Sequence, residues 1–200
     1  MIVYVETNYL FELGLGREQQ ESCRVLVDWC RAGRVGLRLP AFAIPEMHSA
    51  VRRRDGDRLD VIRGLKSQQG DARRHSADPS TYAIAEEGLR AWTLREGNQL
   101  KSLALELFRV ARFLPLDYEA LEITYLLRSL KVLTGDADLF ILASIIRDLD
   151  VRKSQGDTSP SLFVTGDADF ANAKTYLQPY SCDLLTSYSA AVGRLKAQLA

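Results

Sequence analysis

Four acidic residues, each placed where an apolar segment begins or ends, are the side chains of this sequence best suited to chemistry. Glu6 directly follows the first apolar run of the chain, and Asp167 follows a second such run near the C-terminus. Glu46 and Asp138 each stand where an apolar helix is expected to begin. Carboxylates gathered from distant segments repel one another, and a divalent cation is the usual reason for a protein to tolerate them. The pattern indicates an enzyme that uses Mg²⁺ or Mn²⁺.

The type of ligand narrows the choice of metal and of reaction. Neither His48 nor His75 has a ligand-like partner in the sequence. An all-oxygen set of ligands suits Mg²⁺ or Mn²⁺ and not zinc. Such ions stabilise the attacking and leaving oxygens of a phosphodiester displacement, and they lower the pKa of a bound water. The ligand set is therefore suited to an enzyme that promotes phosphodiester displacement.

Each acid taken alone has an ordinary structural explanation. Asp138 could cap its helix, and Glu46 could serve the helix dipole from the first turn. Asp167 and Asp169 could be turn residues in the stretch Gly-Asp-Ala-Asp. Glu6 is harder to explain in this way, because a carboxylate directly after a buried strand needs a partner or a metal. The joint placement of these residues, and no single one of them, supports a metal site.

The elements that must position the acids alternate between strand and helix in the first part of the chain. Short β-branched runs predict strands, and apolar residues at helical spacing predict helices. We expect strands at 1–5 and 35–43, and helices at 8–15, ended by Gly14 and Gly16, and at 18–32; Pro45 opens a further helix. Alternation of this kind is typical of a parallel α/β sheet, whose active crevice lies beyond the carboxyl ends of its strands.

The later segments complete the sheet after a long helical interruption. Residues 80–113 predict one or two helices with a break near Gly97 and Asn98, and Asp117 caps a helix that runs to 133. The remaining expected elements are a helix at 138–149, strands at 161–165 and 182–185, a short helix at 170–177 and a last helix at 187–199.

The only notable basic cluster lies between residues 51 and 75. It holds eight Arg or Lys and four Asp, a local balance of 8 − 4 = +4. RNA phosphates could be contacted by the first four arginines of this cluster, which are Arg52, Arg53, Arg54 and Arg58. The alternative is a solvated face laced with ion pairs, and the sequence leaves both open.

The bulk composition is that of an ordinary soluble protein of one domain. The 200 residues are 46% apolar and carry a net charge of zero, so no global field draws the chain to nucleic acid or to a membrane. We expect the three widely spread cysteines to be buried apolar residues in a reducing compartment. No stretch suggests a secretory signal or a membrane span, and we expect a cytoplasmic protein.

The chain resembles PIN-domain ribonucleases, above all the small prokaryotic ones that include toxins of type II toxin–antitoxin pairs. The resemblance is carried by four blocks that run through the chain in the expected order: residues 2–10, 44–46, 138–143 and 163–170. The first block differs from the usual pattern, because Glu6 stands where the family usually has aspartate.

This resemblance implies one domain over residues 1–200, a three-layer PIN-like fold with a central parallel β-sheet and helices on both faces. Residues 51–113 would form a mainly helical elaboration. It also implies metal-dependent endonucleolytic cleavage of RNA, with an antitoxin protein and a homodimer as further partners. Carried over residue by residue, the catalytic and metal-binding positions are Glu6, Glu46, Asp138 and Asp167, with Asp169 as an additional ligand, and the supporting polar positions are Thr7, Asn8 and Thr165.

Two other classes of function remain open. The first is a regulatory module that binds RNA or protein with this fold but has weak or no catalysis, with Glu6 as the visible reason. The second, more remote, is another acid-based phosphotransfer enzyme with a parallel sheet. The absence of an Asp-x-Asp pair after the first strand argues against the aspartyl-phosphate type.

Overall fold

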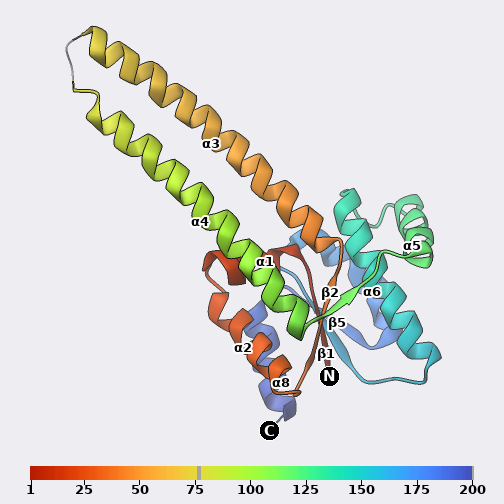
Figure 1. Ribbon diagram of the computed structural model, residues 1–200. Helices are drawn as coiled ribbons and strands as arrows, with labels where there is room; N and C mark the ends of the chain where they lie inside the picture. The colour runs from red at the N-terminus through yellow and green to blue at the C-terminus, as the bar shows by residue number, and fades with distance from the viewer. Residues whose placement is uncertain (76–77, 200) are drawn as a thin grey trace.

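A sheet of five parallel strands lies at the centre of the computed structural model, which describes residues 1–75 and 78–199 (Figure 1). The strand order is β3-β2-β1-β4-β5. The strands are β1 (Ile2–Val5), β2 (Gly36–Pro40), β3 (Arg112–Leu114), β4 (Ser161–Val164) and β5 (Cys182–Leu185). Because β1 and β4 are neighbours in register, with Val5 opposite Val164, the residues that follow these two strands emerge side by side. The expected parallel α/β sheet is confirmed.

Alternating side chains of the inner strands supply a separate core on each face of the sheet. In β1, Val3 and Val5 join one apolar cluster and Tyr4 joins the other. The first cluster is covered by α1 (Thr7–Leu15), α2 (Gln20–Arg31) and α8 (Tyr188–Leu199). The second is covered by α5 (Tyr118–Ser129), α6 (Asp136–Ser154) and the short segment η1 (Ala168–Ala173), α7 (Lys174–Leu177) and η2 (Gln178–Tyr180). Strands buried on both faces explain the continuous apolar runs of the sequence.

Two long helices form an antiparallel hairpin that projects from the body (Figure 1). They are α3 (Ala43–Arg74), with 32 residues, and α4 (Ser80–Val110), with 31. At 1.5 Å per residue each helix is roughly 45–50 Å long. α3 begins after β2, at the edge of the sheet where the predicted acids lie, and α4 returns to the opposite edge before β3. The expected helical middle of the chain is therefore present.

Several predicted boundaries are wrong, and tertiary packing explains most of them. The predicted break near Gly97 and Asn98 is absent, because α4 continues through both and its far end packs into the first core. Gly14 does not end α1; a Cβ at Gly14 would lie 2.7 Å from Leu100 Cδ2, so this glycine permits close contact with α4. Gly16, with φ of 67°, ends the helix as expected.

The remaining differences concern strand and helix ends. Strand β3 lies at 112–114, which the sequence assigned to the helical stretch, and β2 ends at Pro40 instead of residue 43. Helix α6 starts two residues before Asp138 and runs to Ser154. The cysteines are unpaired, with Cys23 and Cys182 buried, in agreement with the expectation. Within the described part of the chain, no helix combines the length and apolarity needed to cross a membrane.

Candidate functional site

Glu6 lies at the end of β1, where it caps α1 with its own side chain. Its Oε2 accepts a hydrogen bond of 2.5 Å from the backbone N–H of Asn8, and its Oε1 accepts one of 3.1 Å from the hydroxyl of Thr165. The hydroxyl of Tyr188, from α8, lies 3.5 Å from the same Oε1. Glu6 is only 3% exposed. Burial raises the pKa of Glu6 to about 7, although the hydrogen bonds from Asn8 and Thr165 oppose the rise.

Thr165 connects the end of β1 with the end of β4. While its hydroxyl donates to Glu6, the same oxygen accepts a 2.9 Å bond from the backbone N–H of Asp167. Asp167 in turn caps the following 3₁₀ segment, because its Oδ1 accepts a 2.9 Å bond from the N–H of Asp169. The turn role that the sequence allowed for Asp167 is therefore real. It holds this loop beside Glu6.

Glu46 and Asp138 come to the same edge of the sheet from the first turns of α3 and α6. Thr7, the first residue of α1, donates its hydroxyl proton to Glu46 Oε2. Burial, and then the negative charges of Glu46, Asp167 and Asp169, raise the pKa of Asp138 to about 6. Glu46 also adds to the raised pKa of Glu6. The structure thus brings acids from all the predicted segments close enough to repel one another.

Asp138 owes the direction of its carboxylate to a glycine that the sequence analysis did not consider. Gly135 is the N-cap of α6, and a Cβ built there would lie 2.5 Å from Asp138 Oδ2. No side chain larger than hydrogen fits at Gly135 while Asp138 keeps this orientation. Asp136 lies outside the acidic group and forms an exposed 2.7 Å ion pair with Arg128.

The acids form a candidate metal site by their chemistry, but the carboxylates of Glu6, Glu46 and Asp167 accept local hydrogen bonds in this arrangement. Among residues 1–75 and 78–199, no three His, Cys, Asp or Glu side chains are placed to hold a metal ion together. Thr7 engages Glu46, and the backbone of Asp169 engages Asp167. An all-oxygen donor set with mutual repulsion fits Mg²⁺ or Mn²⁺, which would offset the crowded negative charge.

The four predicted RNA-binding arginines divide into two pairs. Arg54 and Arg58 turn toward α4, where Arg58 Nη2 lies 2.5 Å from Glu96 Oε2 in an ion pair that is not an aligned hydrogen bond. Arg52 and Arg53 are exposed, and neither forms an ion pair with a described residue. Only Arg52 and Arg53 therefore keep their charge available to a phosphate.

Further along the hairpin, ion pairs neutralise basic side chains of α3. Acids pair with the cations of the distal α3: Arg63 with Asp60, Lys66 with Glu86, and Arg74 with Asp71. The alternative of a solvated face with interleaved ion pairs thus describes most of the basic cluster.

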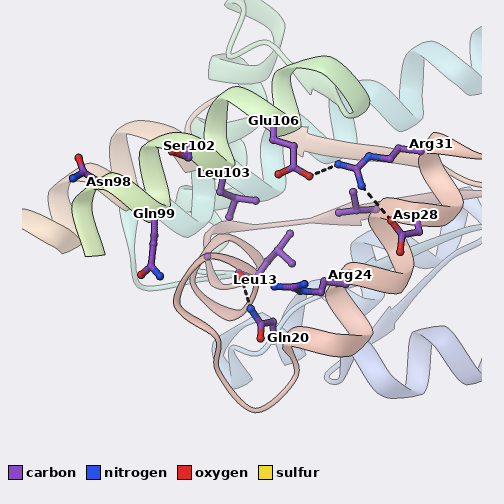
Figure 2. A pocket seen from close by; sticks show the side chains of 12 residues that line it. Leu13, Gln20, Arg24, Asp28, Arg31, Asn98, Gln99, Ser102, Leu103 and Glu106 are labelled. Atoms are coloured by element: carbon purple, nitrogen blue, oxygen red, sulfur yellow. Dashed lines mark hydrogen bonds and ion pairs between the residues drawn. The ribbon is translucent and has the colours of Figure 1, made fainter. Parts of the chain in front are cut away.

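A groove of about 560 Å³ lies elsewhere, between α1, α2 and α4 (Figure 2). Arg24 reaches into it from α2, and Gln20 donates to the carbonyl of Leu13 at its edge. Its acids, Asp28 and Glu106, are both engaged by Arg31. None of the predicted acids lines this groove, so it is separate from the candidate site.

Comparison of the chain with protein-family models, with curated proteins and with solved structures finds no match.

Proposed function

We propose that this protein is a metal-dependent endoribonuclease of PIN type. The observation that carries the proposal is the meeting of Glu46, Asp138, Asp167 and Asp169 at the carboxyl edge of the sheet, where their charges raise the pKa of Asp138. A crevice beyond the ends of parallel strands is the usual place for a site in such a sheet. Three features support the proposal of a PIN-like fold. They are the strand order, the helices on both faces of the sheet, and the acids after β1 and β4.

Residues of this chain would share the work as follows. Asp138, Asp167 and Glu46 would hold Mg²⁺ or Mn²⁺ once their side chains turn toward one another, with the exposed Asp169 as an additional ligand and the buried Glu6 as a further acid of the group. The ion, when bound, would neutralise charge on the phosphate and make a bound water more acidic. Thr7 and Thr165 orient Glu46 and the loop of Asp167 through their hydrogen bonds. Arg52 and Arg53 would contact neighbouring phosphates.

A second candidate is a regulatory module of the same fold that binds RNA or protein without catalysis. The observation that favours it is the buried position of Glu6, whose two oxygens are already taken by Asn8 and Thr165. A glutamate held in this way contributes less readily to a metal than the more accessible acids of the group do. The ribonuclease proposal includes a cytoplasmic location, an antitoxin partner and a homodimer. These three expectations lose their support if the ribonuclease proposal fails.

One experiment separates these two candidates. Purified protein is incubated with structured and with single-stranded RNA, in Mn²⁺ or in a chelator, beside the variant Asp138→Asn. We expect cleavage that needs the metal and disappears in the variant. Absence of cleavage of every RNA, together with no rise of the melting temperature in Mn²⁺, would favour the binding module.

A further inference from the structure

The outer part of the α3–α4 hairpin carries apolar side chains that its two helices do not bury by themselves. Beyond the body, α3 and α4 lie beside no other element that the structure describes (Figure 1). Five large apolar residues of this part are 45–70% exposed: Leu59, Val61, Ile84, Trp92 and Leu94. Because helices in proteins owe most of their stability to packing of an apolar face, this surface is suited to a partner.

Two of these residues line a cavity of about 380 Å³ between the helices, which we call the hairpin groove. Its apolar lining consists of Leu59 and Ile62 from α3 and Leu94 from α4. Leu59 and Leu94 are 45% and 68% exposed, whereas Ile62 is 4% exposed. In a four-helix bundle, apolar side chains of a second pair of helices fill such a space. The hairpin groove therefore has the form of half a bundle.

The hairpin groove has a negative end and a positive end. Asp55 lines it one turn before Leu59, on the side of the body, because α3 runs outward. Arg90 lines it one turn before Leu94, on the side of the tip, because α4 runs back. At 1.5 Å per residue, each charge lies about 6 Å from its leucine along the helix axis, in opposite directions. The third charged residue of the lining, Arg58, already pairs with the buried Glu96.

The present partners of Asp55 and Arg90 leave both charges exchangeable. Asp55 lies 3.5 Å from Arg58, and Arg90 lies 2.9 Å from Glu86, each within about one turn of the same helix. Pairs of this kind between partly exposed side chains contribute little to stability. Both charges can therefore form new pairs across an interface.

These positions make the hairpin groove complementary to itself. When two copies face each other across a two-fold axis with their hairpins antiparallel, Asp55 of each copy meets Arg90 of the other. A parallel arrangement would instead set like charges against each other, which is unfavourable. An isologous contact of this kind closes after two copies.

The charge and the size of the surface also suit a second copy. Residues 55–94 contain six Arg or Lys and seven Asp or Glu, a balance of 6 − 7 = −1, so no strong field draws a nucleic acid to this part of the hairpin. A contact about 30 Å long and two helices wide removes roughly 600 Å² from each copy, about 1,200 Å² in total. That total lies at the lower end of the range for specific interfaces.

We propose that a second copy of this chain covers the hairpin groove, so that the two hairpins form an antiparallel four-helix bundle. The surface lies outside the four blocks that carry the resemblance to PIN proteins. The pairing therefore does not follow from that resemblance, and it does not rest on the proposed ribonuclease function.

Sedimentation velocity over a dilution series, in a chelator and without RNA, measures the pairing. We expect the wild type to form a dimer with a Kd in the micromolar range. Leu94→Gln changes a side chain that is exposed in the single copy, so it should weaken the dimer by about tenfold or more and leave the circular-dichroism spectrum unchanged. The matched control is Leu126→Gln on α5, at a side chain that is 58% exposed, and it should leave the dimer intact.

Charge reversal tests the antiparallel arrangement. Asp55→Arg should prevent self-association because two positive charges then face each other at each contact, and Arg90→Asp should prevent it through two negative charges. An equimolar mixture of the two variants should restore a dimer, because every contact between them again joins opposite charges.

Three results would overturn the proposal: a wild type that stays monomeric through the micromolar range, a Leu94→Gln dimer as tight as that of the wild type, or a mixture without a dimer. A dimer that Leu126→Gln disrupts would also overturn it, by placing the contact on α5. Cleavage of RNA by a monomeric protein would refute the pairing and leave the ribonuclease proposal standing, whereas a dimer without any cleavage would do the reverse.

Discussion

Two acidic side chains at the same edge of the sheet, Glu6 and Asp138, have different surroundings. Glu6 is withdrawn into the protein and held by Asn8 and Thr165, whereas Asp138 stays half-exposed near the other acids. Both have a raised pKa, for Glu6 mainly through burial and for Asp138 through burial and neighbouring charge. The two positions therefore respond differently to pH and to substitution.

The pH dependence of stability should reveal Glu6. Its pKa rises from 4.5 to about 7 on folding, so the folded protein binds this proton more tightly than the unfolded chain. The contribution of Glu6 to stability is thus fully present below about pH 4.5 and is lost as the pH rises through 7. In the metal-free protein we expect a loss on the order of 3 kcal/mol from this group.

Urea unfolding in a chelator between pH 5 and pH 8.5 measures this effect. Glu6→Gln should flatten the fall in stability, and Glu18→Gln, at an exposed position, should leave the wild-type slope unchanged. A wild-type slope in the Glu6→Gln variant would show that Glu6 is already ionised in the folded protein.

Gly135 should control Asp138 without affecting the fold. Its φ of −87° suits alanine, so Gly135→Ala should not lower the melting temperature. The new methyl group must displace the Asp138 carboxylate by about 1 Å, which would reduce Mn²⁺-dependent cleavage by roughly 10–100-fold. Gly88→Ala, where a Cβ meets nothing within 4 Å, is the control and should retain full activity. Full activity of Gly135→Ala would mean that the orientation of Asp138 is unimportant.

Among the elements, the α3–α4 hairpin is unusual because buried ion pairs join its two helices near their middle. Glu96 is 6% exposed and faces Arg54 and Arg58 across the two helices. Arg58 also lies over the ring of Trp92, 4.7 Å from its centroid. Beyond Met47, only Ile62 of α3 is buried among the described residues, so apolar packing contributes little to the outer half.

Glu96→Gln should therefore loosen the hairpin. The substitution leaves two guanidinium groups without their carboxylate, and we expect a loss of about 1–3 kcal/mol, moderated because Arg54 is a third exposed. Urea unfolding gives the size of the loss, and hydrogen exchange should rise mainly in α3 and α4. Glu87→Gln, at an exposed position on α4, should change stability by less than about 0.5 kcal/mol. A loss equal to that control would mean that the ion pairs are replaced by water at no cost.

For the whole molecule, the division of buried residues separates a body from an arm. In α4 the buried positions begin at Glu96 and continue to Leu107, all near the body. Arg58 pairs with Glu96 and Lys66 pairs with Glu86 across the hairpin. Because Ile62 lies midway between Arg58 and Lys66, it is level with the part of α4 around Trp92. The outer hairpin can therefore be removed at a level where the helices are adjacent.

Replacing residues 63–91 with a short glycine-rich turn should leave the body folded. We expect a melting temperature within a few degrees of the wild type, because neither core cluster has a member among residues 63–91. Unfolding of the shortened chain would show that the arm stabilises the body. Cleavage of a short RNA should persist, since Arg52, Arg53 and every acid of the site remain.

The sequence predicted the strands and the approach of the acids because both depend on local signals. β-branched runs mark β1 and β4, and acids directly after parallel strands must lie at one edge of the sheet. The contact of Tyr188 with Glu6 has no such signal, since 182 positions separate them. Strand β3 is too short to stand out, and the aromatic contact between Phe42 and Phe140 depends on how α3 and α6 approach each other.

The arm also has a consequence for the order in which the chain folds. Strands β2 and β3 are neighbours in the sheet, yet about seventy residues separate Pro40 from Arg112. Closing a flexible loop of that length costs entropy before the pairing yields any gain. Helices form faster than distant contacts, so α3 and α4 can associate first and bring the two ends together. The hairpin then acts as a local template that converts a distant strand pairing into a nearby one.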